Sequence, residues 1–261
     1  MATRTSADIS QPSAIEVATP LRAGERTDPS GRPIKNHILL SIPDYEYHLL
    51  RPHLEFVDLE NHLVLQEPRG RIEHGYFLNQ GMVSLVVATT DGRSVEVGLV
   101  GREGIVGALL TVGLDQSPYR AVVQISGEGV RLRARMLKGT LASAPNLHLL
   151  LNRYAHMQGL QMAQIAACNR LHDIDQRLAR WLLMSQDRVD SEWLPITHDF
   201  LATMLGTGRP TVSLAAGLLQ RKGLIQYMRG AVRVVDRKGL ENAACECYGV
   251  VQQYNGALGL K

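Results

Sequence analysis

The chain has 261 residues, of which 45% are hydrophobic, and its 28 Lys and Arg against 25 Asp and Glu leave a formal net charge of only +3. The length exceeds the ~100–200 residues of a usual single domain, so two domains with buried cores are expected. The small net charge excludes a uniformly basic nucleic-acid coat, and three cysteines cannot form the paired framework of a small secreted domain, which favours the reducing cytoplasm.

The first 35 residues carry alternating charges and no aromatic side chain, and they include Pro12, Pro20, Pro29 and Pro33. Because such a composition buries too little apolar surface to fold, residues 1–35 are predicted to be a disordered tail. They also lack the apolar core of a secretory signal. The most apolar run, MVSLVVA from Met82, is far shorter than the ~20 residues of a membrane helix, so no membrane partner is expected.

From Asn36 onward, apolar and polar residues alternate with a period of two, as they do in β-strands. A short helix is predicted across Asp44–Leu50, followed by the brief alternating runs HLEFVDL and HLVLQ. The stretch MVSLVVATTDGRSVEVGLV predicts a hairpin, because Asp91-Gly92 supplies the positive φ angles of a tight turn between β-branched residues.

A further strand pair is predicted at AVVQI and VRLRA, with Gly127 and Gly129 between them. Several short strands at this spacing, without intervening helices, favour an all-β sandwich or jelly roll over a parallel sheet. This β-domain is expected to end near Pro145.

A long helical pattern follows, with Asn146 available as its cap. Steps of three and four from Leu147 reach Leu150, Tyr154, Met157, Gln161, Gln164, Cys168 and Leu171. Because a helix that is apolar beyond one stripe needs contacts on more than one side, a second copy of the chain is the expected partner. Packing wholly within its own chain is the alternative.

The stretch HDFLATMLGTGRPTVSLAAGLLQRKGLI resembles one amphipathic helix interrupted by GTGRP. Thr197 is suited to cap a first helix that ends near Leu205, and Gly206 suits the left-handed turn that follows. Pro210 belongs in the first turn of a second helix, where its missing N–H is not needed. The pattern predicts two helices that cross over a short turn, as in a helix-turn-helix.

The second helix is expected to turn Val212, Ala215, Ala216, Leu218 and Leu219 toward the first helix. Its polar side near the start carries Arg209, Thr211 and Ser213. The following GLIQYMRGAVRVV predicts a two-stranded hairpin with Arg229-Gly230 at its tip, which completes a winged helix-turn-helix. Residues 191–240 hold seven Lys or Arg against three Asp or Glu, and this local basic excess favours DNA as the ligand.

These motifs carry a family resemblance. ITHDFLATMLGTGRPTVSLAAGLLQRKGLI and the preceding NRLHDIDQRLARWLL resemble the hinge and DNA-binding domain of CRP/FNR transcription regulators. Upstream, Gly81 to Leu85, the turn at Asp91 to Arg93 and EGIVGALL resemble the cyclic-nucleotide-binding β-roll of that family. The resemblance implies an α+β chain with a double-stranded β-helix (jelly-roll-like) sensor domain, a long dimerisation helix and a C-terminal winged helix-turn-helix.

The predicted division has five segments: a disordered tail at 1–35, the β-roll at 36–145, the dimerisation helix and hinge at 146–187, the winged helix-turn-helix at 188–245, and a C-terminal tail at 246–261. The expected partners are double-stranded DNA with a pseudo-palindromic operator, a second copy of the chain, RNA polymerase and an unidentified small-molecule effector.

Arg209 matches the arginine that begins the recognition helix of the family and reads guanine, to which an arginine donates bidentately. The acidic residue that usually follows is Pro210 here, and the second basic reader is Leu214, so the preferred DNA sequence should differ from the prototype's. The predicted DNA-binding residues share exposure on the turn, the helix start or the wing; they are Thr197, Thr207, Gly208, Arg209, Thr211, Ser213 and Arg229.

The effector pocket departs from the cyclic-AMP-binding pattern of the family. Gly107-Ala108 stands in place of its Gly-Glu pair, Arg120-Ala121 in place of its Arg-Ser pair, and Met162-Ala163 in place of its Thr-Ser pair. A phosphate held by Arg120 alone would lack much of its hydrogen bonding, so an effector other than cyclic AMP is expected. Gly107, Arg120 and Ala121 remain the candidate effector residues, and a solvated surface role is the alternative for Arg120.

No metal and no cofactor is predicted. An iron–sulphur sensor needs four thiolates, mostly near the N-terminus, and no cysteine precedes Cys168. The pair Cys245 and Cys247 fits a thiol sensor or half a metal site, or two small apolar residues in a helix, which is the preferred interpretation. Four histidines of the β-domain lack ligand spacing: His48, His53, His62 and His74.

Two other classes of function compete with a DNA-binding regulator. An enzyme is not expected, because GxxxxGKT, GxSxG and HExxH are all absent. An effector-sensing module that acts mainly through protein contacts, with a weakened DNA-binding domain, stays open because two usual base readers are replaced.

Overall fold

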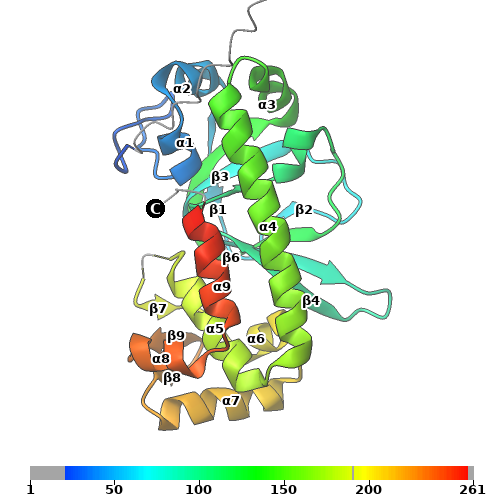
Figure 1. Cartoon of the computed structure of the whole chain (residues 1–261), viewed down its shortest axis with the longest axis vertical. Helices are drawn as coiled ribbons and strands as arrows, with labels where there is room; N and C mark the ends of the chain where they lie inside the picture. Colours follow the sequence, from blue (N-terminus) through cyan, green and yellow to red (C-terminus); the bar gives the residue numbers. More distant parts are fainter. Residues whose placement is uncertain (1–20, 190, 258–261) are drawn as a thin grey trace, which may run out of the picture.

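The computed structural model describes residues 21–189 and 191–257, with a β-domain at one end of the molecule and a helical domain at the other. The helix α4 (Pro145–Leu171) runs along both (Figure 1). This is the predicted α+β arrangement, with an antiparallel sheet first and a helix-turn-helix last. None of the described helices combines the length and apolar character that crossing a bilayer requires.

The β-domain begins with two short helices and a 3-10 turn, α1 (His37–Ser41), α2 (Asp44–Leu50) and η1 (Arg51–His53). Its strands are β1 (Glu55–Leu59), β2 (Val64–Gln66), β3 (His74–Ala88), β4 (Ser94–Val100), β5 (Ile105–Val106) and β6 (Arg120–Arg133). The 3-10 helix η2 (Ala108–Val112) follows β5, and α3 (Ala134–Leu141) follows β6. The strands form one antiparallel sheet of order β1-β6-β3-β4, in which β2 also pairs with β6 and β5 with β3.

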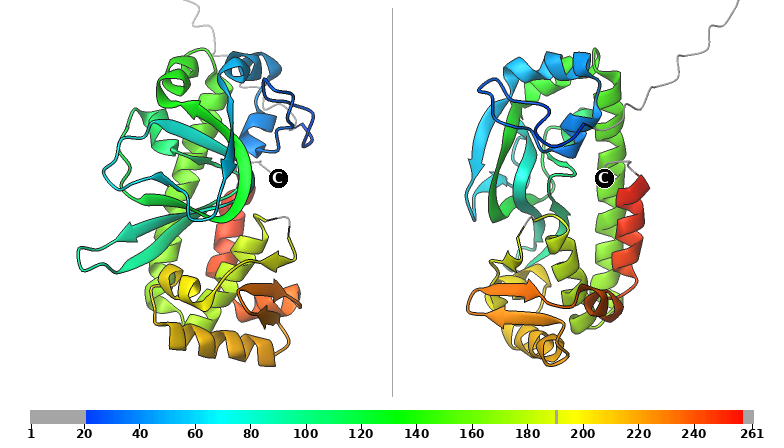
Figure 2. Two further views of the ribbon diagram at one scale, coloured as in Figure 1. Left: turned by 180° about the vertical axis from the view of Figure 1, so that it is seen from behind. Right: turned by 90° about the vertical axis from the view of Figure 1, so that its left-hand side faces the viewer.

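The predicted hairpin is the pair β3 and β4. Ala88 is paired with Ser94, and Gly92 adopts a φ of 85° in the turn between them. The predicted helix at Asp44–Leu50 is α2. Figure 2 shows the curled sheet on one side of the molecule and α4 on the other.

The predicted strand pair across Gly127 and Gly129 is wrong, because both halves belong to the single strand β6. A Cβ atom at Gly127 would lie 2.1 Å from the backbone oxygen of Gln80, and one at Gly129 would lie 2.4 Å from that of Phe77. The two glycines therefore permit close approach of β6 to β3 and do not form a turn.

Residues 21–35 are not disordered, which corrects part of the predicted tail; residues 1–20 lie outside the described residues. Arg26 is 6% exposed and donates hydrogen bonds to the backbone oxygens of Leu39 and Ile42 and to the Asp44 carboxylate. Hydrogen bonds from a buried polar group to neighbouring elements order a segment whose composition is otherwise polar. The charges of Arg26 and Asp28 are thus buried within the fold, whereas Arg22, Glu25 and Arg32 are exposed.

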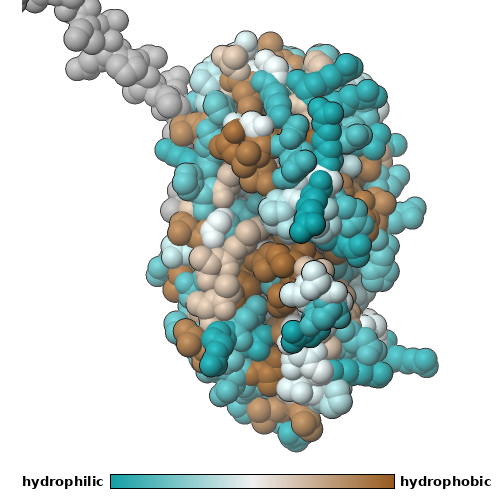
Figure 3. All heavy atoms as spheres, turned by 90° about the vertical axis from the view of Figure 1, so that its right-hand side faces the viewer, coloured by the Kyte–Doolittle hydropathy of each residue, from teal (hydrophilic) through white to brown (hydrophobic). Residues whose placement is uncertain are grey.

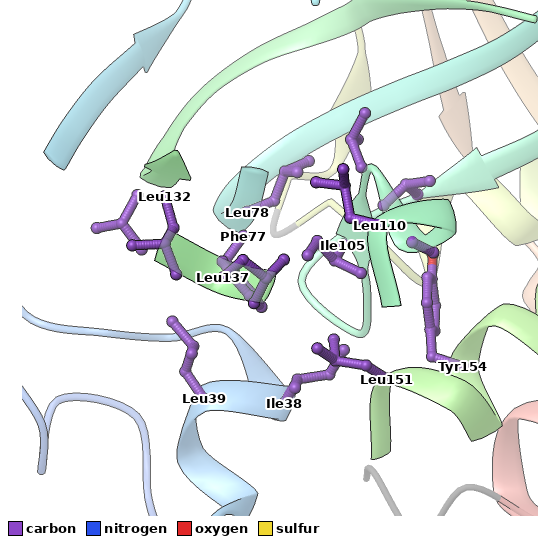
Figure 4. Close-up of a cluster of buried hydrophobic side chains, with 14 of the residues drawn as sticks. Ile38, Leu39, Phe77, Leu78, Ile105, Leu110, Leu132, Leu137, Leu151 and Tyr154 are labelled. Carbon is purple, nitrogen blue, oxygen red and sulfur yellow. The ribbon is translucent and has the colours of Figure 1, made fainter. Parts of the chain in front are cut away.

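The main hydrophobic core lies between the sheet, α1, α3 and α4. Figure 4 shows side chains from all four meeting there, among them Ile38, Phe77, Leu137 and Leu151. Five members of the predicted α4 stripe are buried within this chain: Leu147, Leu150, Tyr154, Gln161 and Cys168. The stripe therefore faces its own chain, as the alternative interpretation had it, and any partner must use a neighbouring face of α4.

A buried carboxylate caps the start of α4. Glu46, which is fully buried, accepts hydrogen bonds from the backbone N–H groups of Asn146 and Leu147 at 2.9 and 2.7 Å. A negative charge at a helix N-terminus is stabilised by the unpaired N–H groups and the helix dipole. Asn146 is thus not the cap; Glu46 of α2 takes that function and fastens α4 to the β-domain.

The chain breaks between α4 and α5 (Ile174–Gln186). His172 is the C-terminal cap of α4, and Asp173 forms a capping box with Gln176 at the start of α5. A capping box satisfies two unpaired N–H groups at once, so a new helix begins here although the helical pattern of the sequence continues across the break. We call residues 172–173 the hinge.

The helical domain contains α5, α6 (His198–Met204), α7 (Arg209–Arg221), α8 (Arg237–Ala243) and a sheet of β7 (Trp193–Leu194), β9 (Ala231–Val234) and β8 (Ile225–Met228) in that order. Residues 247–257, predicted to be a tail, form the helix α9 (Cys247–Ala257). It packs alongside α4 (Figures 1 and 2). The sequence alone did not predict α9, because the helix is stabilised by contacts with α4, which is distant in the sequence.

Two polar contacts cross the boundary between the domains. Glu96 on β4 is 3% exposed and accepts hydrogen bonds from Ser84 on β3 and from Nε1 of Trp181 on α5, the latter at 2.8 Å. Arg188, after α5, donates from Nε to Glu103 Oε1 at 2.8 Å, and the two side chains are only 4% and 15% exposed. The β-domain and α5 thus share a buried polar interface.

Glu96 predicts a pH dependence of stability. Burial raises the pKa of its carboxyl to about 7, although hydrogen bonds from Ser84 and Trp181 and the charges of Arg180 and Arg188 oppose the shift. The folded protein therefore binds this proton more tightly than the unfolded chain, where the ordinary value is 4.5. The free energy of unfolding should fall as pH rises from about 4.5 to about 7 and then level off.

Urea unfolding across this pH range measures the effect in the wild type and in Glu96→Gln, which keeps an amide in place of the carboxyl. The substitution should remove that part of the fall, whereas Glu60→Gln, at an exposed carboxylate, should retain it. Coincident pH profiles for the wild type and Glu96→Gln would contradict the assignment.

Candidate nucleic-acid interface

The turn between α6 and α7 follows the predicted pattern. Thr197 caps α6 by accepting a hydrogen bond from Phe200 N at 3.2 Å. Gly206 has a φ of 60°, a conformation that glycine adopts without a Cβ clash, and Thr207 N donates to Ala202 O at 2.9 Å. Gly208 then caps α7, so Thr207 and Gly208 lie in the turn itself.

Arg209 is the first residue of α7 and is directed to solvent. Its side chain is 65% exposed and makes one ion pair, from Nη1 to Asp199 Oδ2 on α6 at 3.4 Å. An exposed pair of this kind contributes little to stability, so the guanidinium is available to another acceptor.

The two sides of α7 differ as predicted. Val212, Ala215, Ala216 and Leu219 are buried against the rest of the helical domain. On the opposite side Thr211 is exposed and Leu214 is 74% exposed, which is unusual for a large apolar side chain of a packed domain. The exposed start of α7 thus presents one cation, one hydroxyl and one apolar side chain.

Ser213 lies deeper than predicted. It is half-buried, and its hydroxyl shares a hydrogen bond of 2.9 Å with Nδ1 of His198. The His198 ring stacks against Tyr227 on β8 at 4.1 Å between centroids. Burial and the nearby Arg209 charge hold the pKa of His198 below its usual value, which favours a neutral ring. The contact joins α6, α7 and the wing, and no local sequence signal announced it.

The wing is the predicted hairpin of β8 and β9, with exposed Arg229 at its tip and Gly230 at a φ of 80°. Three basic residues of this region are engaged within the protein: Arg233 with Glu192, Arg237 with Asp187, and Lys238 with Glu241. Within residues 21–189 and 191–257, no carboxylate pairs with Arg221, Lys222 or Arg229. The basic charge left for an anionic ligand is therefore on α7 and the wing tip.

The three candidate effector residues lie in the β-domain. Gly107 has a φ of 102°, and a Cβ atom there would lie 3.2 Å from Nε2 of Gln66, whose strand pairs with Ala121. The Gln66 side chain is 7% exposed, and both its amide atoms lack a hydrogen-bond partner among the described residues. Arg120 is half-exposed and forms a bidentate pair with Glu67, with both contacts at 3.0 Å.

A buried polar chain links this domain to α4. The Tyr119 hydroxyl donates to Oε1 of Gln158 at 3.4 Å, and Nε2 of Gln158 donates to the Tyr154 hydroxyl at 3.3 Å. Burial raises the pKa of Tyr119 to about 12 and that of Tyr154 well above its usual value, so both stay protonated. The resemblance placed the adenine contact at Met162, four residues beyond Gln158, and did not identify this chain.

Among the described residues, Cys168, His172, Cys245 and Cys247 form a group with metal-ligating chemistry, and their donor atoms all lie within 4.8 Å of one another. Cys245 precedes α9 and Cys247 begins it, so the preferred interpretation of both as helix residues is incomplete. A hydrogen bond from Cys168 lowers the pKa of Cys245 against the effect of burial. The available signal was the spacing C-x3-H followed by C-x-C.

Comparison with known proteins supports the assignment of the helical domain. Residues 176–243 match the Crp-like helix-turn-helix domain family. The chain is also 28% identical over 186 residues to the transcriptional regulator SdrP of Thermus thermophilus, a similarity that covers 67% of this chain and 86% of SdrP.

Solved structures share the fold over most of the chain at low sequence identity. FixK2 from Bradyrhizobium japonicum is 14% identical, with a TM-score of 0.63, over 74% of this chain and 98% of its own. A CRP-family transcriptional regulator from Thermus thermophilus is 20% identical, with a TM-score of 0.59, over 72% of this chain and 96% of its own. Residues 176–243 thus match a helix-turn-helix family, and the chain as a whole is similar to a transcriptional regulator and shares the fold of solved CRP/FNR-type regulators.

Proposed function

We propose that the protein is a homodimeric, cytoplasmic regulator that inserts the start of α7 into the major groove of a pseudo-palindromic operator. The observation that carries this proposal is the exposed set Arg209, Thr211 and Leu214 at the start of α7. A recognition helix contacts base edges through its N-terminal residues, and an arginine there pairs with guanine O6 and N7.

Leu214 deepens the proposal. An apolar side chain on the recognition helix contacts the C5-methyl group of thymine, which is the only apolar group on the major-groove edge. The operator half-site should therefore contain a guanine read by Arg209 and, deeper along α7, a thymine read by Leu214. The half-buried Ser213, held by His198, then acts on the orientation of α7 and not on a base.

The second copy is proposed to pack on the face of α4 left free by its own chain. Exposed apolar side chains lie there and on neighbouring η2: Leu160 is 45% exposed, Val112 59% and Leu171 74%. A shallow hollow lined by Val112, Ala155, Gly159 and Leu160, with Asn152 and His156, lies between the two elements. Figure 3 shows hydrophobic side chains gathered over the middle of this side of the molecule. Exposed apolar patches of this kind favour a protein partner.

An effector is proposed to bind beside Gly107, where the unpaired Gln66 amide offers one donor and one acceptor. The pairing of Arg120 with Glu67 argues against a phosphate held by that arginine. Such a ligand regulates DNA binding only if it binds two states of the protein unequally, and the chain Tyr119–Gln158–Tyr154 connects this region to α4.

Selection from a pool of random duplexes, combined with sedimentation of the free protein, tests the proposal. The expected result is one palindromic motif whose half-sites lie about one helical turn apart, bound by two chains. Selection of no motif by a well-folded dimer would instead support the alternative, a module that acts mainly through protein contacts.

Arg229 is expected to contact a phosphate from the wing tip. Replacing Arg229 with alanine should weaken binding by a similar factor for specific and random duplexes, and should lower the slope of log affinity against log salt by about two, one for each chain of the dimer. Fluorescence anisotropy over a salt series measures both effects. Arg233→Ala is the matched control, because Arg233 is already paired with Glu192; a change confined to one operator sequence would argue for base contact by Arg229.

A further inference from the structure

Three cysteines and one histidine meet where the end of α4 approaches the start of α9. Cys168 and His172 are four residues apart at the end of α4, so they project from the same side of the helix. Cys245 and Cys247 flank one residue at the entry to α9. The fold therefore brings together two pairs of side chains separated by more than 70 positions.

The distances between the donor atoms fit a single tetrahedral ion. Sγ of Cys168 lies 3.4 Å from Sγ of Cys245, and Sγ of Cys247 lies 3.6 Å from Nδ1 of His172. Around zinc, with Zn–S near 2.3 Å and Zn–N near 2.0 Å, two sulphur atoms lie about 3.8 Å apart and a sulphur and a nitrogen about 3.6 Å. The widest pair, within 4.8 Å, needs to close by only about an ångström.

We propose that Cys168, His172, Cys245 and Cys247 bind one zinc ion in a tetrahedral Cys3His site that clamps α9 to the hinge. Three thiolates and one imidazole are a ligand set typical of structural zinc. An iron–sulphur cluster is disfavoured, because its thiolates bind different iron atoms and surround a larger body than these donor atoms leave room for.

Neighbouring polar residues contact the four side chains in the way that outer contacts orient the ligands of a metal site. Nε2 of His172 lies 3.1 Å from Oε1 of Glu246, which leaves Nδ1 directed at Cys247. Nε2 of Gln164 donates to Sγ of Cys247 at 3.0 Å. A carboxylate on the far nitrogen of a ligating histidine, and N–H donors on the thiolates, are the outer contacts that metal sites use.

A buried cation supplies independent support. Arg180 on α5 is 2% exposed, and its Nε and Nη1 atoms have no hydrogen-bond partner among the described residues. Its charge acts on Cys168 and Cys245. One Zn²⁺ with three thiolates and a neutral imidazole carries a net charge of −1, which compensates this guanidinium; three neutral thiols do not.

Binding holds all three sulphur atoms as thiolates and releases the protons that they carried beforehand, up to three, with no change in oxidation state. The ion then connects α4 and the hinge, through Cys168 and His172, to the entry of α9. Because the metal binds the folded arrangement and not the unfolded chain, it stabilises the position of α9 against α4.

Metal analysis of full-length protein, purified without a polyhistidine tag and under reductant, tests the proposal. About one zinc per chain is expected by inductively coupled plasma mass spectrometry, and none after dialysis of His172→Ala or Cys245→Ala. Cobalt should replace zinc with the absorption of a tetrahedral thiolate complex. Removal of zinc by a chelator should increase amide hydrogen exchange in residues 247–257.

Glu246→Gln provides a test that does not depend on refolding, because Glu246 is 74% exposed. It should lower zinc affinity about 10- to 100-fold. His53→Ala, at an exposed histidine of η1, should leave zinc content unchanged. Folded wild-type protein that takes up no added zinc, that holds an iron–sulphur chromophore, or that carries a Cys168–Cys245 disulfide under reductant would overturn the proposal.

Discussion

Replacing Arg209 with alanine should lower the affinity of the dimer for the selected operator about 30-fold or more, because a bidentate contact to guanine worth about 1–3 kcal/mol is lost in each of the two half-sites. Specificity should relax at one base pair of each half-site, while binding to random duplexes falls much less. Fluorescence anisotropy on the operator and on single-base variants measures both quantities.

Asp199→Asn is the matched control for this experiment. It breaks the same ion pair, 3.4 Å long, from the other side and leaves the guanidinium in place. Operator affinity should then stay the same or rise, because a carboxylate near the phosphates is removed. Equal losses in Arg209→Ala and Asp199→Asn would mean that the pair positions α7 and that Arg209 reads no base.

Replacing Glu103 with alanine should cost about 3–5 kcal/mol in the free energy of unfolding, since it leaves Arg188 buried without its partner. Among the described residues, Arg188 then retains the hydrogen bond from Nη1 to Met184 O at 2.8 Å. Because the pair joins the β-domain to the segment after α5, effector control of DNA binding should weaken as well. Urea unfolding followed by circular dichroism measures the stability change.

Glu55→Ala is the control, because it removes an ion pair of similar length that is more exposed. Nε of Arg131 lies 3.0 Å from Oε2 of Glu55, and the two side chains are 38% and 41% exposed. The substitution should cost less than about 1 kcal/mol. The double variant Glu103→Leu with Arg188→Met should regain much of the lost stability, because two apolar side chains leave no buried charge. A loss in Glu103→Ala no larger than in Glu55→Ala would sink this prediction.

Features set by local chemistry were predictable from the sequence. The turn at Gly206, the restart at Pro210 and the hairpin at Asp91-Gly92 each depend on the backbone preferences of one or two residues. A recognition helix with Arg209 first follows from the same short stretch. These signals act over a few positions, so no knowledge of the tertiary fold was needed.

Features set by distant contacts were not predictable. Gly127 and Gly129 suggested a turn, and only the closeness of β3 shows that they serve packing. The composition of residues 21–35 suggested disorder, and only the hydrogen bonds from Arg26 to α1 and α2 show that the segment is folded. The group of Cys168, His172, Cys245 and Cys247 likewise needs α9 folded against α4 to exist. In each case the partner residues lie far away in the sequence.

The Asp199–Arg209 pair bears on how the protein searches a genome. A chromosome offers about 10⁶–10⁹ competing sites, so useful recognition depends on the ratio of specific to random affinity. An arginine that already has a carboxylate partner gains little by exchanging it for a single phosphate, but gains more from the two acceptors of a guanine. Asp199 would thus shorten the time that the protein stays bound to wrong sequences, and change the time that it stays bound to the operator very little.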